Sequence, residues 1–296
     1  MHQILRYTAF IVVALCVAAP PVAAQKTQQI FVKVTGPNGA IGDLQPGDIK
    51  VTEDDVACKV LKVEPAGPMK IQVLVDNGQV NTNPINGLRD GLQAFFEKMP
   101  EGVEMSMYTT APQGRPIVKP TTDKKKLIAG IDLITPERGV GAFFESLLDA
   151  VDRVSRDKTP GFPLIMIVGS DAGVEEIKDR DVQDVQQKII RNAITFHVVM
   201  MSGGRNQSSR TGLQPEIGMS VTKLTGGRYE VINATTRLAT LLPEFADRIA
   251  QAAVQQRNQY RITYEGAAKR SASTKIAVSV AREGTVTTSL DGRLTN

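Results

Sequence analysis

The sequence predicts an α/β fold: a mostly parallel, Rossmann-like sheet with helices on both faces, inserted in a small β domain built from both chain termini. Three observations predict it. The middle of the chain alternates continuous apolar runs with segments of helical apolar spacing, which is typical of a parallel sheet covered on both faces. Both flanks instead alternate apolar and polar residues, as half-buried strands do. Neither flank supplies enough strands to bury a core alone, so we expect the two flanks to pair.

Residues 1–24 are predicted to be a secretory signal peptide. A basic residue precedes the apolar run "TAFIVVALCVAA", and the small residues Val22–Ala24 precede Gln25. This segment is too short, and wrongly flanked, for a stable membrane span. A lipoprotein signal at Cys16 is an alternative, although Leu15 is larger than the small residue expected before a lipidated cysteine. We therefore expect a secreted or periplasmic mature protein without a membrane span.

The composition sets limits on the partner and on what holds the fold together. The 296 residues carry a formal net charge of +4, with 42% hydrophobic and 22% charged residues, which suits one or two soluble domains with a real core. Acidic and basic residues alternate without a basic stripe, so we expect no nucleic-acid partner. Signal cleavage would leave Cys58 as the one cysteine, and its strand spacing indicates a buried, inert thiol.

The two flanks read as strands joined by turns. The N-terminal β segment, residues 25–67, contains "QIFVKVTG" and "DIKVTEDDVACKVLKVE" around a loop rich in Gly, Pro and Asn. The C-terminal β segment, residues 257–296, contains "NQYRITYE" and "TKIAVSVARE". We interpret the polar stretch "GAAKRSAST" between the latter two as a hairpin connection.

Residues 68–256 form the predicted α/β domain. Asp123 is expected to cap one helix, Gly226 and Gly227 to end another, and Pro243 to mark the start or a kink of the last. The expected strands are "MKIQVLVD", "GVEMSMYTT", "FPLIMIVGSD", "ITFHVVMM" and "GRYEVI". The expected helices are "INGLRDGLQAFFEKM", "DKKKLIAGIDLI", "AFFESLLDAVDRVSR", "RDVQDVQQKIIRNA", "GMSVTKLTG" and "LATLLPEFADRIAQAAVQQR".

This order of elements resembles the von Willebrand factor type A (VWA) domain family, and more closely its bacterial secreted members. The stretches that carry the resemblance are "VKVTGPNGAIGDLQPGDIKVTEDD", "KIQVLVDNG" and "LTGGRYEVINATTRLATLLPEFADRIAQAAVQQRNQYRITYE". The resemblance covers nearly the whole mature chain. It implies an ion site at the carboxyl ends of the strands, where the family binds a divalent cation. The family's ligands come from Asp-x-Ser-x-Ser after the first core strand, a later Thr, and an Asp after the fourth strand.

The ion-site motif is degenerate in this sequence. Residues 76–80 read Asp-Asn-Gly-Gln-Val, so Gly78 and Val80 stand where the family has hydroxyl residues. The Thr position falls on Gly141. Because Mg²⁺ prefers a near-octahedral shell of oxygen ligands, the resemblance with these departures predicts a degenerate, metal-free site.

The aspartate of this motif has two possible roles. We expect Asp76 to accept hydrogen bonds from backbone N–H groups at the strand-to-helix turn. The alternative is a metal-dependent (Mg or Mn) adhesion site, at least a weak one, with Asp76 and either Asp171 or, by a shift in register, Ser170 as ligands.

We find no catalytic residues and no cofactor-binding residues in the sequence. His197 lies in the apolar run "ITFHVVM", where a core role is expected. Ser170 in "GSDAG" has no evident base, and the sequence contains no Gly-x-Ser-x-Gly elbow, Walker loop or Gly-x-Gly-x-x-Gly motif. An exported hydrolase is the remaining alternative to a non-enzymatic protein.

The favoured function is therefore a secreted, non-enzymatic binding or scaffold module that mediates protein–protein or envelope interactions. Partners of open α/β sheets bind at the carboxyl ends of the strands. If no metal is present, an arginine could meet a partner's carboxylate instead. Solvated arginines without a partner are the other interpretation. The candidate partner-binding residues are Asp76, Asn77, Gln79, Asn81, Arg138, Arg205 and Arg210.

Overall fold

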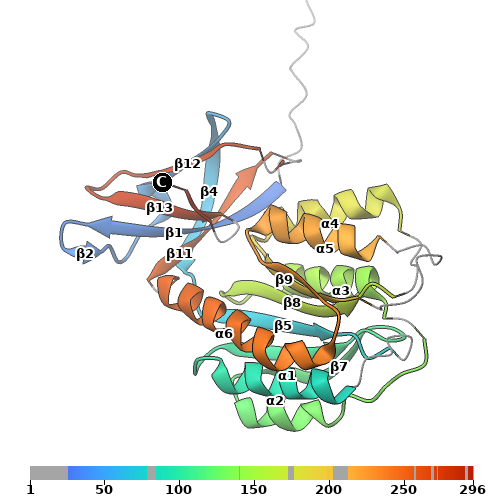
Figure 1. Cartoon of the computed structure of the whole chain (residues 1–296). Helices are drawn as coiled ribbons and strands as arrows, with labels where there is room; N and C mark the ends of the chain where they lie inside the picture. The colour runs from blue at the N-terminus through green and yellow to red at the C-terminus, as the bar shows by residue number, and fades with distance from the viewer. Residues whose placement is uncertain are drawn as a thin grey trace, which may run out of the picture.

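A computed structural model gives the fold as two sheets (Figure 1). It describes residues 26–78, 85–139, 141–172, 177–202, 213–256, 258–267, 270–271, 273–290 and 293–295, with side-chain burial up to residue 286. The predicted signal peptide therefore lies outside the described residues. No helix in the described ranges has the length and apolar character needed to cross a membrane.

The central sheet has six strands in the order β10-β9-β8-β5-β6-β7. All neighbours are parallel except β7, which runs antiparallel to β6. The mostly parallel sheet expected from the sequence is thus confirmed. The strands are β5 Met69–Val75, β6 Glu104–Thr109, β7 Arg115–Thr121, β8 Phe162–Ser170, β9 Thr195–Met201 and β10 Tyr229–Ile232.

Strand β7 was not predicted. Its sequence contains Pro116 and Pro120, and proline cannot donate a hydrogen bond to a neighbouring strand. Proline is accordingly confined to sheet edges, which is where β7 lies. The prolines that concealed the strand in the sequence also leave this edge unfit to pair further.

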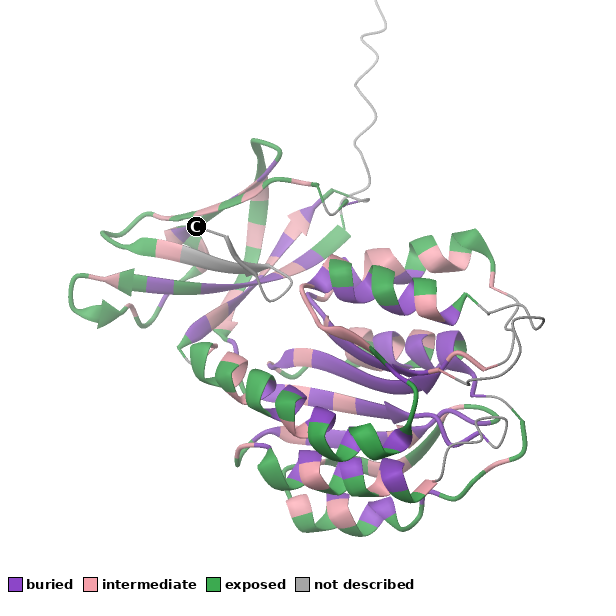
Figure 2. Ribbon diagram, in the orientation of Figure 1, coloured by how far each residue is buried: buried purple, intermediate pink, exposed green. Residues whose placement is uncertain are grey.

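Helices cover both faces of this sheet, as predicted (Figure 1). One apolar core packs α1 Ile85–Lys98, α2 Lys124–Ile131 and α6 Leu238–Gln255 against one face. A second core packs α3 Phe143–Arg156, α4 Asp179–Arg191 and α5 Gln214–Thr225 against the other. Figure 2 shows buried residues concentrated along the central strands and on the helix sides that face them.

The helix boundaries follow the expected chemistry in part. Asp123 caps α2, since its side chain accepts a hydrogen bond from Lys125 N at 3.0 Å. Gly226 ends α5 in the left-handed region, with φ of 67°, as a helix-stop glycine does. Pro243 does not begin α6. That helix follows the short turn η2 Thr235–Arg237, begins at Leu238 and contains Pro243 inside it.

The second sheet is built from both ends of the chain. Its order is β12-β3-β4-β11-β1-β13-β14, with β2 paired to β1, and all pairs are antiparallel. Strand β11 lies between β4 and β1, so C-terminal and N-terminal strands interleave. The elements are β1 Lys26–Gly36, β2 Gly39–Ala40, η1 Pro46–Asp48, β3 Ile49–Glu53, β4 Val56–Pro65, β11 Gln259–Gly266, β12 Ile276–Val280, β13 Thr285–Leu290 and β14 Arg293–Thr295.

Two details of this sheet differ from the expectation. The connection after β11 is not a hairpin, because β12 pairs with β3 and the chain must pass β4 to reach it. The run "DIKVTEDDVACKVLKVE" is two strands, since Asp54 and Asp55 form a turn with φ of 46° and 66°. Two consecutive residues with positive φ are typical of a tight hairpin turn.

The second sheet curls on itself. Strands β12 and β13 are consecutive in sequence but far apart in the strand order. The connection between them, residues 281–284, can span at most about 18 Å. The two ends of the sheet must therefore approach each other, which encloses a small apolar core. Its buried residues are Ile30, Val32, Val34, Leu44, Ile49, Val51, Ile262 and Tyr264.

Direct contacts fix the curled sheet to the α/β unit. The rings of Phe31 and Phe162 lie 4.0 Å apart between centroids. Arg261 donates to Glu64 Oε1 on β4 at 3.0 Å from Nε and 2.5 Å from its terminal nitrogen. The same guanidinium donates to the carbonyl of Thr159 in the α/β unit at 3.4 Å. This partly buried ion pair therefore links the curled sheet to the α/β unit.

Candidate functional site

Asp76 stands at the centre of the sheet's carboxyl edge. It directly follows β5, whose neighbours are β8 and β6, and its N–H donates to Val168 O on β8 at 2.8 Å. The backbone hydrogen bonding between β5 and β8 therefore continues through Asp76 and fixes the Asp76 side chain at the carboxyl ends of the strands. Only 5% of Asp76 is exposed, so its carboxyl group is inside the protein.

The Asp76 carboxylate is satisfied by the chain itself. Ser170 Oγ, at the end of β8, donates to Asp76 Oδ2 at 2.6 Å. Gly78 N–H donates to Asp76 Oδ1 at 2.9 Å. Burial raises the pKa of the Asp76 carboxyl, and the bonds from Ser170 and Gly78 act in the opposite direction. The bond from Gly78 is of the backbone type expected at this turn; the bond from Ser170 was not anticipated.

Two glycines let the backbone close over this carboxylate. A Cβ added to Gly141 would lie 2.4 Å from Asp76 Oδ1 and 2.7 Å from Thr110 Oγ1. A Cβ added to Gly78 would lie 2.8 Å from Gly139 O. Glycine permits such close approach because it has no side chain. A threonine at position 141, as the VWA resemblance would place there, does not fit this arrangement.

The residues present do not fit a hard divalent cation. Such an ion requires near-octahedral oxygens at about 2.1 Å. Both Asp76 oxygens already accept bonds from Ser170 and Gly78, and the Gly141 backbone lies against both Asp76 Oδ1 and Thr110 Oγ1. Within the described residues, no group of three or more His, Cys, Asp or Glu side chains is arranged to hold a metal.

Asn77 has a structural role, because its hydrogen bonds hold two neighbouring loops against the end of β5. Its Nδ2 donates to Thr135 O at 2.7 Å, and its Oδ1 accepts from Ala111 N at 3.2 Å. Its carbonyl accepts from Glu137 N at 2.9 Å. Asn77 is 4% exposed. Neither Asn77 nor Asp76 therefore presents its side chain to a partner.

The other predicted site residues are placed as follows. Ser170 contacts Asp76 through its hydroxyl. The Asp171 N–H donates to Met201 O at 3.0 Å, and the charge of Asp171 adds to burial in raising the pKa of Tyr229. Arg138 is exposed. Gln79, Val80, Asn81, Arg205 and Arg210 lie outside the described residues.

Two hydroxyls near this edge were missed by the sequence analysis. Thr110 Oγ1 and Ser146 Oγ are buried and have no hydrogen-bond partner in the described part of the chain. The Thr110 backbone is fixed, because its N–H donates to Val75 O and its carbonyl accepts from Ala142 N, both at 3.0 Å. The sequence could have indicated Thr110, because "GVEMSMYTT" is a predicted strand that ends in two threonines at the carboxyl edge of the sheet.

His197 is a core residue, as the sequence indicated. It is buried, its Nδ1 accepts from Arg228 N at 2.9 Å, and its ring lies edge-on to Phe245 with centroids 5.5 Å apart. Burial, with the charges of Arg248 and Arg228, lowers its pKa to about 3. The imidazole is therefore neutral at ordinary pH. In the described structure it shares no hydrogen bond with Ser170, whose hydroxyl is bonded to Asp76.

Comparison with known proteins gives similarity of fold. No family model and no curated protein sequence matches the chain. A von Willebrand factor type A structure from Catenulispora acidiphila covers 90% of this chain and 73% of its own, with TM-score 0.52 and 10% identity. The human COPII-coat protein Sec24c matches 78% of this chain over 43% of its own, with TM-score 0.50 and 8% identity.

A third similar structure is an aerotolerance-related membrane protein from Bacteroides fragilis. It covers 61% of this chain and 99% of its own, with TM-score 0.47 and 12% identity. At these identities, the matches to the von Willebrand factor type A structure and to Sec24c speak to architecture rather than to activity.

Proposed function

Starting from a chain with the fold of a von Willebrand factor type A domain, we propose that this protein is a secreted or periplasmic binding or scaffold module. It is non-enzymatic and acts without a bound metal. The observation that carries the proposal is the closed state of Asp76. Its two carboxylate oxygens accept bonds from Ser170 Oγ and Gly78 N–H, and Gly141 packs against them. An adhesion site of the metal-dependent kind needs that carboxylate to face an ion instead.

The burial of Ser170 and of its partner Asp76 supports a non-enzymatic role. Ser170 Oγ donates a hydrogen bond to a buried carboxylate, and His197 Nδ1 accepts one from the backbone N–H of Arg228. A nucleophile needs a general base within hydrogen-bond reach. In the described structure the base bonded to Ser170 is the Asp76 carboxylate, and with 4% and 5% exposure neither group is open to a substrate, which argues against the hydrolase alternative.

The partner surface in this proposal is the exposed rim of the same edge. Arg138 is exposed there, directly after Glu137, whose carboxylate is paired with Arg115 at 2.7 Å. Because the Glu137 carboxylate is already paired with Arg115, it is less available to pair with Arg138, and Arg138 can bind a carboxylate of the partner instead. A guanidinium can bind a partner's carboxylate in a bidentate manner. The partner is therefore an acidic protein surface or an acidic envelope component.

Capture in the presence and absence of metal tests this function. The chain from Gln25 onward is immobilised and exposed to the envelope and secreted fractions of the organism that makes it, in EDTA and in excess Mg²⁺. The same partner should be captured equally in both buffers. Arg138→Glu should reduce capture, and Arg156→Glu, an exposed arginine at the far end of α3, should not. Capture that disappears in EDTA would contradict the metal-free proposal.

Export is tested separately. N-terminal sequencing of the secreted or periplasmic protein should give Gln25 as the first residue, because the small residues before it form the cleavage junction. A lipid-modified start at Cys16 would contradict the proposed soluble, released form.

A further inference from the structure

A polar strip crosses one face of the central sheet. In the parallel pair β5–β6, Lys70 stands opposite Glu104, and Gln72 stands opposite Ser106. The residues between them, such as Ile71 and Met105, point to the other face and belong to its apolar core. Central strands of a sheet covered on both faces are normally apolar on both. Polar residues on this face of β5 and β6 are therefore unusual for central strands that helices cover on both faces.

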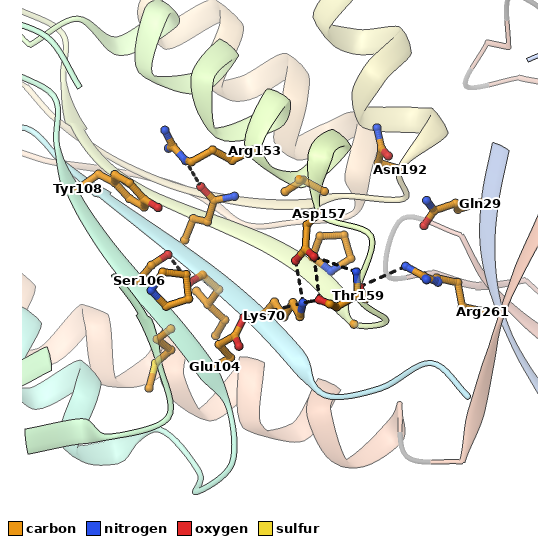
Figure 3. Close-up of a pocket in the computed structure, with 17 residues that line it drawn as sticks. Gln29, Lys70, Glu104, Ser106, Tyr108, Arg153, Asp157, Thr159, Asn192 and Arg261 are labelled. Atoms are coloured by element: carbon orange, nitrogen blue, oxygen red, sulfur yellow. Dashed lines mark hydrogen bonds and ion pairs between the residues drawn. The ribbon is translucent and has the colours of Figure 1, made fainter. Parts of the chain in front are cut away.

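A cavity of about 250 Å³ lies over this strip. It is bounded by the end of α3, by the segment that leads into β8, and by β1 and β11 of the curled sheet (Figure 3). Strand β5 contributes residues of its amino-terminal half, Lys70 to Gln72, whereas Asp76 follows the other end of that strand and does not line the cavity. A cavity of about 150 Å³ holds benzene, so this one has room for a molecule of roughly benzoate size.

Arg153 lines this cavity without an ion-pair partner in the described part of the chain. Its Nε donates to Gln72 Oε1 at 2.7 Å, and its guanidinium carbon lies 3.9 Å from the centre of the Tyr108 ring. Both partners are uncharged. Among the described residues, no carboxylate lies within the 4.0 Å ion-pair distance of this guanidinium. Burial lowers the Arg153 pKa, and the charge of Asp149, which lies beyond ion-pair distance, acts in the opposite direction.

The other two cations of the cavity are paired, which singles out Arg153. Lys70 Nζ lies 2.7 Å from Asp157 Oδ2 and also donates to Thr159 Oγ1. Arg261 is paired with Glu64 at 2.5 Å. Lys70 Nζ also lies 3.9 Å from Glu104 Oε1, so the lining carboxylates are held near Lys70. The Arg153 guanidinium, on the wall formed by Tyr108 and α3, is the lining cation without an ion pair in the part of the chain that the structure describes.

We propose that this cavity binds a carboxylate carried by a small, partly apolar molecule of about benzoate size. The terminal nitrogens of Arg153 form a bidentate pair with the carboxylate. The ring or chain of the ligand packs on Val154, Pro120 and Pro163, which line the same cavity. The carboxylate has two sources, a free small acid or the C-terminus of a peptide. The proposal concerns a second site and stands independently of the function assigned to the opposite edge.

Calorimetric titration with sodium benzoate tests the proposal. A ligand of this size held by one ion pair should bind with a Kd of about 1 mM. Benzamide, which has the same shape without the charge, should bind at least ~10-fold more weakly because the ion pair is lost. Sodium chloride at matched ionic strength controls for nonspecific screening.

Variants of α3 assign the binding to Arg153. Arg153→Gln should weaken benzoate binding at least ~10-fold, and Arg153→Lys should weaken it less, since it keeps the charge but loses the planar fork. Arg156→Gln, three positions further along α3, should change it less than ~2-fold, because the charge of Arg156 acts on Arg153 but its side chain is exposed and screened by solvent. Thermal unfolding of each variant verifies that the fold is intact.

A peptide arm distinguishes the two sources. Acetyl-Ala-Ala-Phe with a free C-terminus is compared with its amide. Tighter binding of the free acid than of benzoate identifies a peptide terminus, and weaker binding identifies a free acid. The proposal is overturned if the wild-type protein shows no saturable benzoate binding below about 20 mM, which is weaker than the ion pair predicts, or if Arg153→Gln binds benzoate as the wild type does.

Discussion

Two charged residues that contact the central sheet, Asp76 and Arg153, differ in how their charges are satisfied. At the carboxyl end, Asp76 is buried and both its oxygens accept hydrogen bonds from the chain. At the amino end, Arg153 faces a cavity and has neutral partners, Gln72 and the Tyr108 ring. A buried polar group that is fully satisfied contributes to structure, whereas a cation that lines a cavity without an ion pair is the feature on which the proposed ligand site rests. We infer from this contrast that Asp76, at the edge where VWA domains bind an ion, has a structural role in this protein: it holds the ends of β5 and β8 and the following turn together.

The largest expected effect comes from adding one atom at the closed end. Gly141→Ala would place its Cβ 2.4 Å from Asp76 Oδ1, so the backbone or the carboxylate must shift. We expect a loss of about 3 kcal/mol in the free energy of unfolding, at the upper end for overpacking. Gly47→Ala is the matched control, because its Cβ would meet nothing within 4 Å. Urea unfolding that gives equal losses for both variants would contradict a closed site.

Two buried serines at opposite ends of the sheet form a matched pair. Ser170 donates to the Asp76 carboxylate at 2.6 Å, whereas Ser106 donates to the carbonyl of Ile71 at 3.4 Å. Ser170→Ala should cost about 1–3 kcal/mol because it leaves a buried charged acceptor short of a donor. Ser106→Ala should cost about 0.5–1.5 kcal/mol, since the lost bond is neutral and long. A larger loss for Ser106→Ala in urea unfolding would reverse the comparison.

The pH dependence of unfolding tests the burial of Asp76. Its pKa is raised above the ordinary 3.8 in the folded state, so the folded protein binds a proton that the unfolded chain releases. The contribution of Asp76 to stability is therefore largest below pH 3.8 and falls as pH rises through the raised folded value. Asp76→Asn, which cannot ionise, should lack this fall. Parallel pH profiles for the two proteins would mean that the carboxyl group is not desolvated.

His197 gives the opposite sign in an overlapping range. Its pKa falls from 6.5 to about 3 on folding, so between these values the unfolded chain binds a proton that the folded protein does not. Stability is therefore gained as pH rises through this window and lost as it falls, by up to about 1.4 kcal/mol per pH unit. His197→Gln should flatten this slope in chemical unfolding measured across the window. An unchanged slope would show that the imidazole is solvated.

Much of the fold was predictable because it depends on local patterns. Apolar runs and helical spacing identified five of the six strands and all six helices of the central α/β unit. Strand β7 was hidden by its prolines. We expected β12 to form a hairpin with β11, but it pairs with β3. That pairing depends on the curl of the whole sheet, which no short stretch of sequence indicates.

The candidate site was less predictable because its contacts are distant in sequence. Ser170 is 94 positions from Asp76, and Asn77 is 58 positions from Thr135. Gly141 was recognised as a missing oxygen ligand, but not as a position where only glycine fits. The cavity at the other end left a signal that was overlooked. "MKIQVLVD" was interpreted as continuously apolar, although Lys70 and Gln72 alternate with apolar residues in it.

Thermal unfolding of wild type and Asp76→Ala, each in EDTA and in excess Mg²⁺ or Mn²⁺, tests most directly whether Asp76 is a structural acceptor rather than a metal ligand. A metal bound to the folded state must raise its Tm by mass action. The closed site predicts the same wild-type Tm with and without metal, and an equal drop for Asp76→Ala in both buffers. A wild-type Tm that rises and saturates at micromolar metal, with no such rise in Asp76→Ala, would contradict this account.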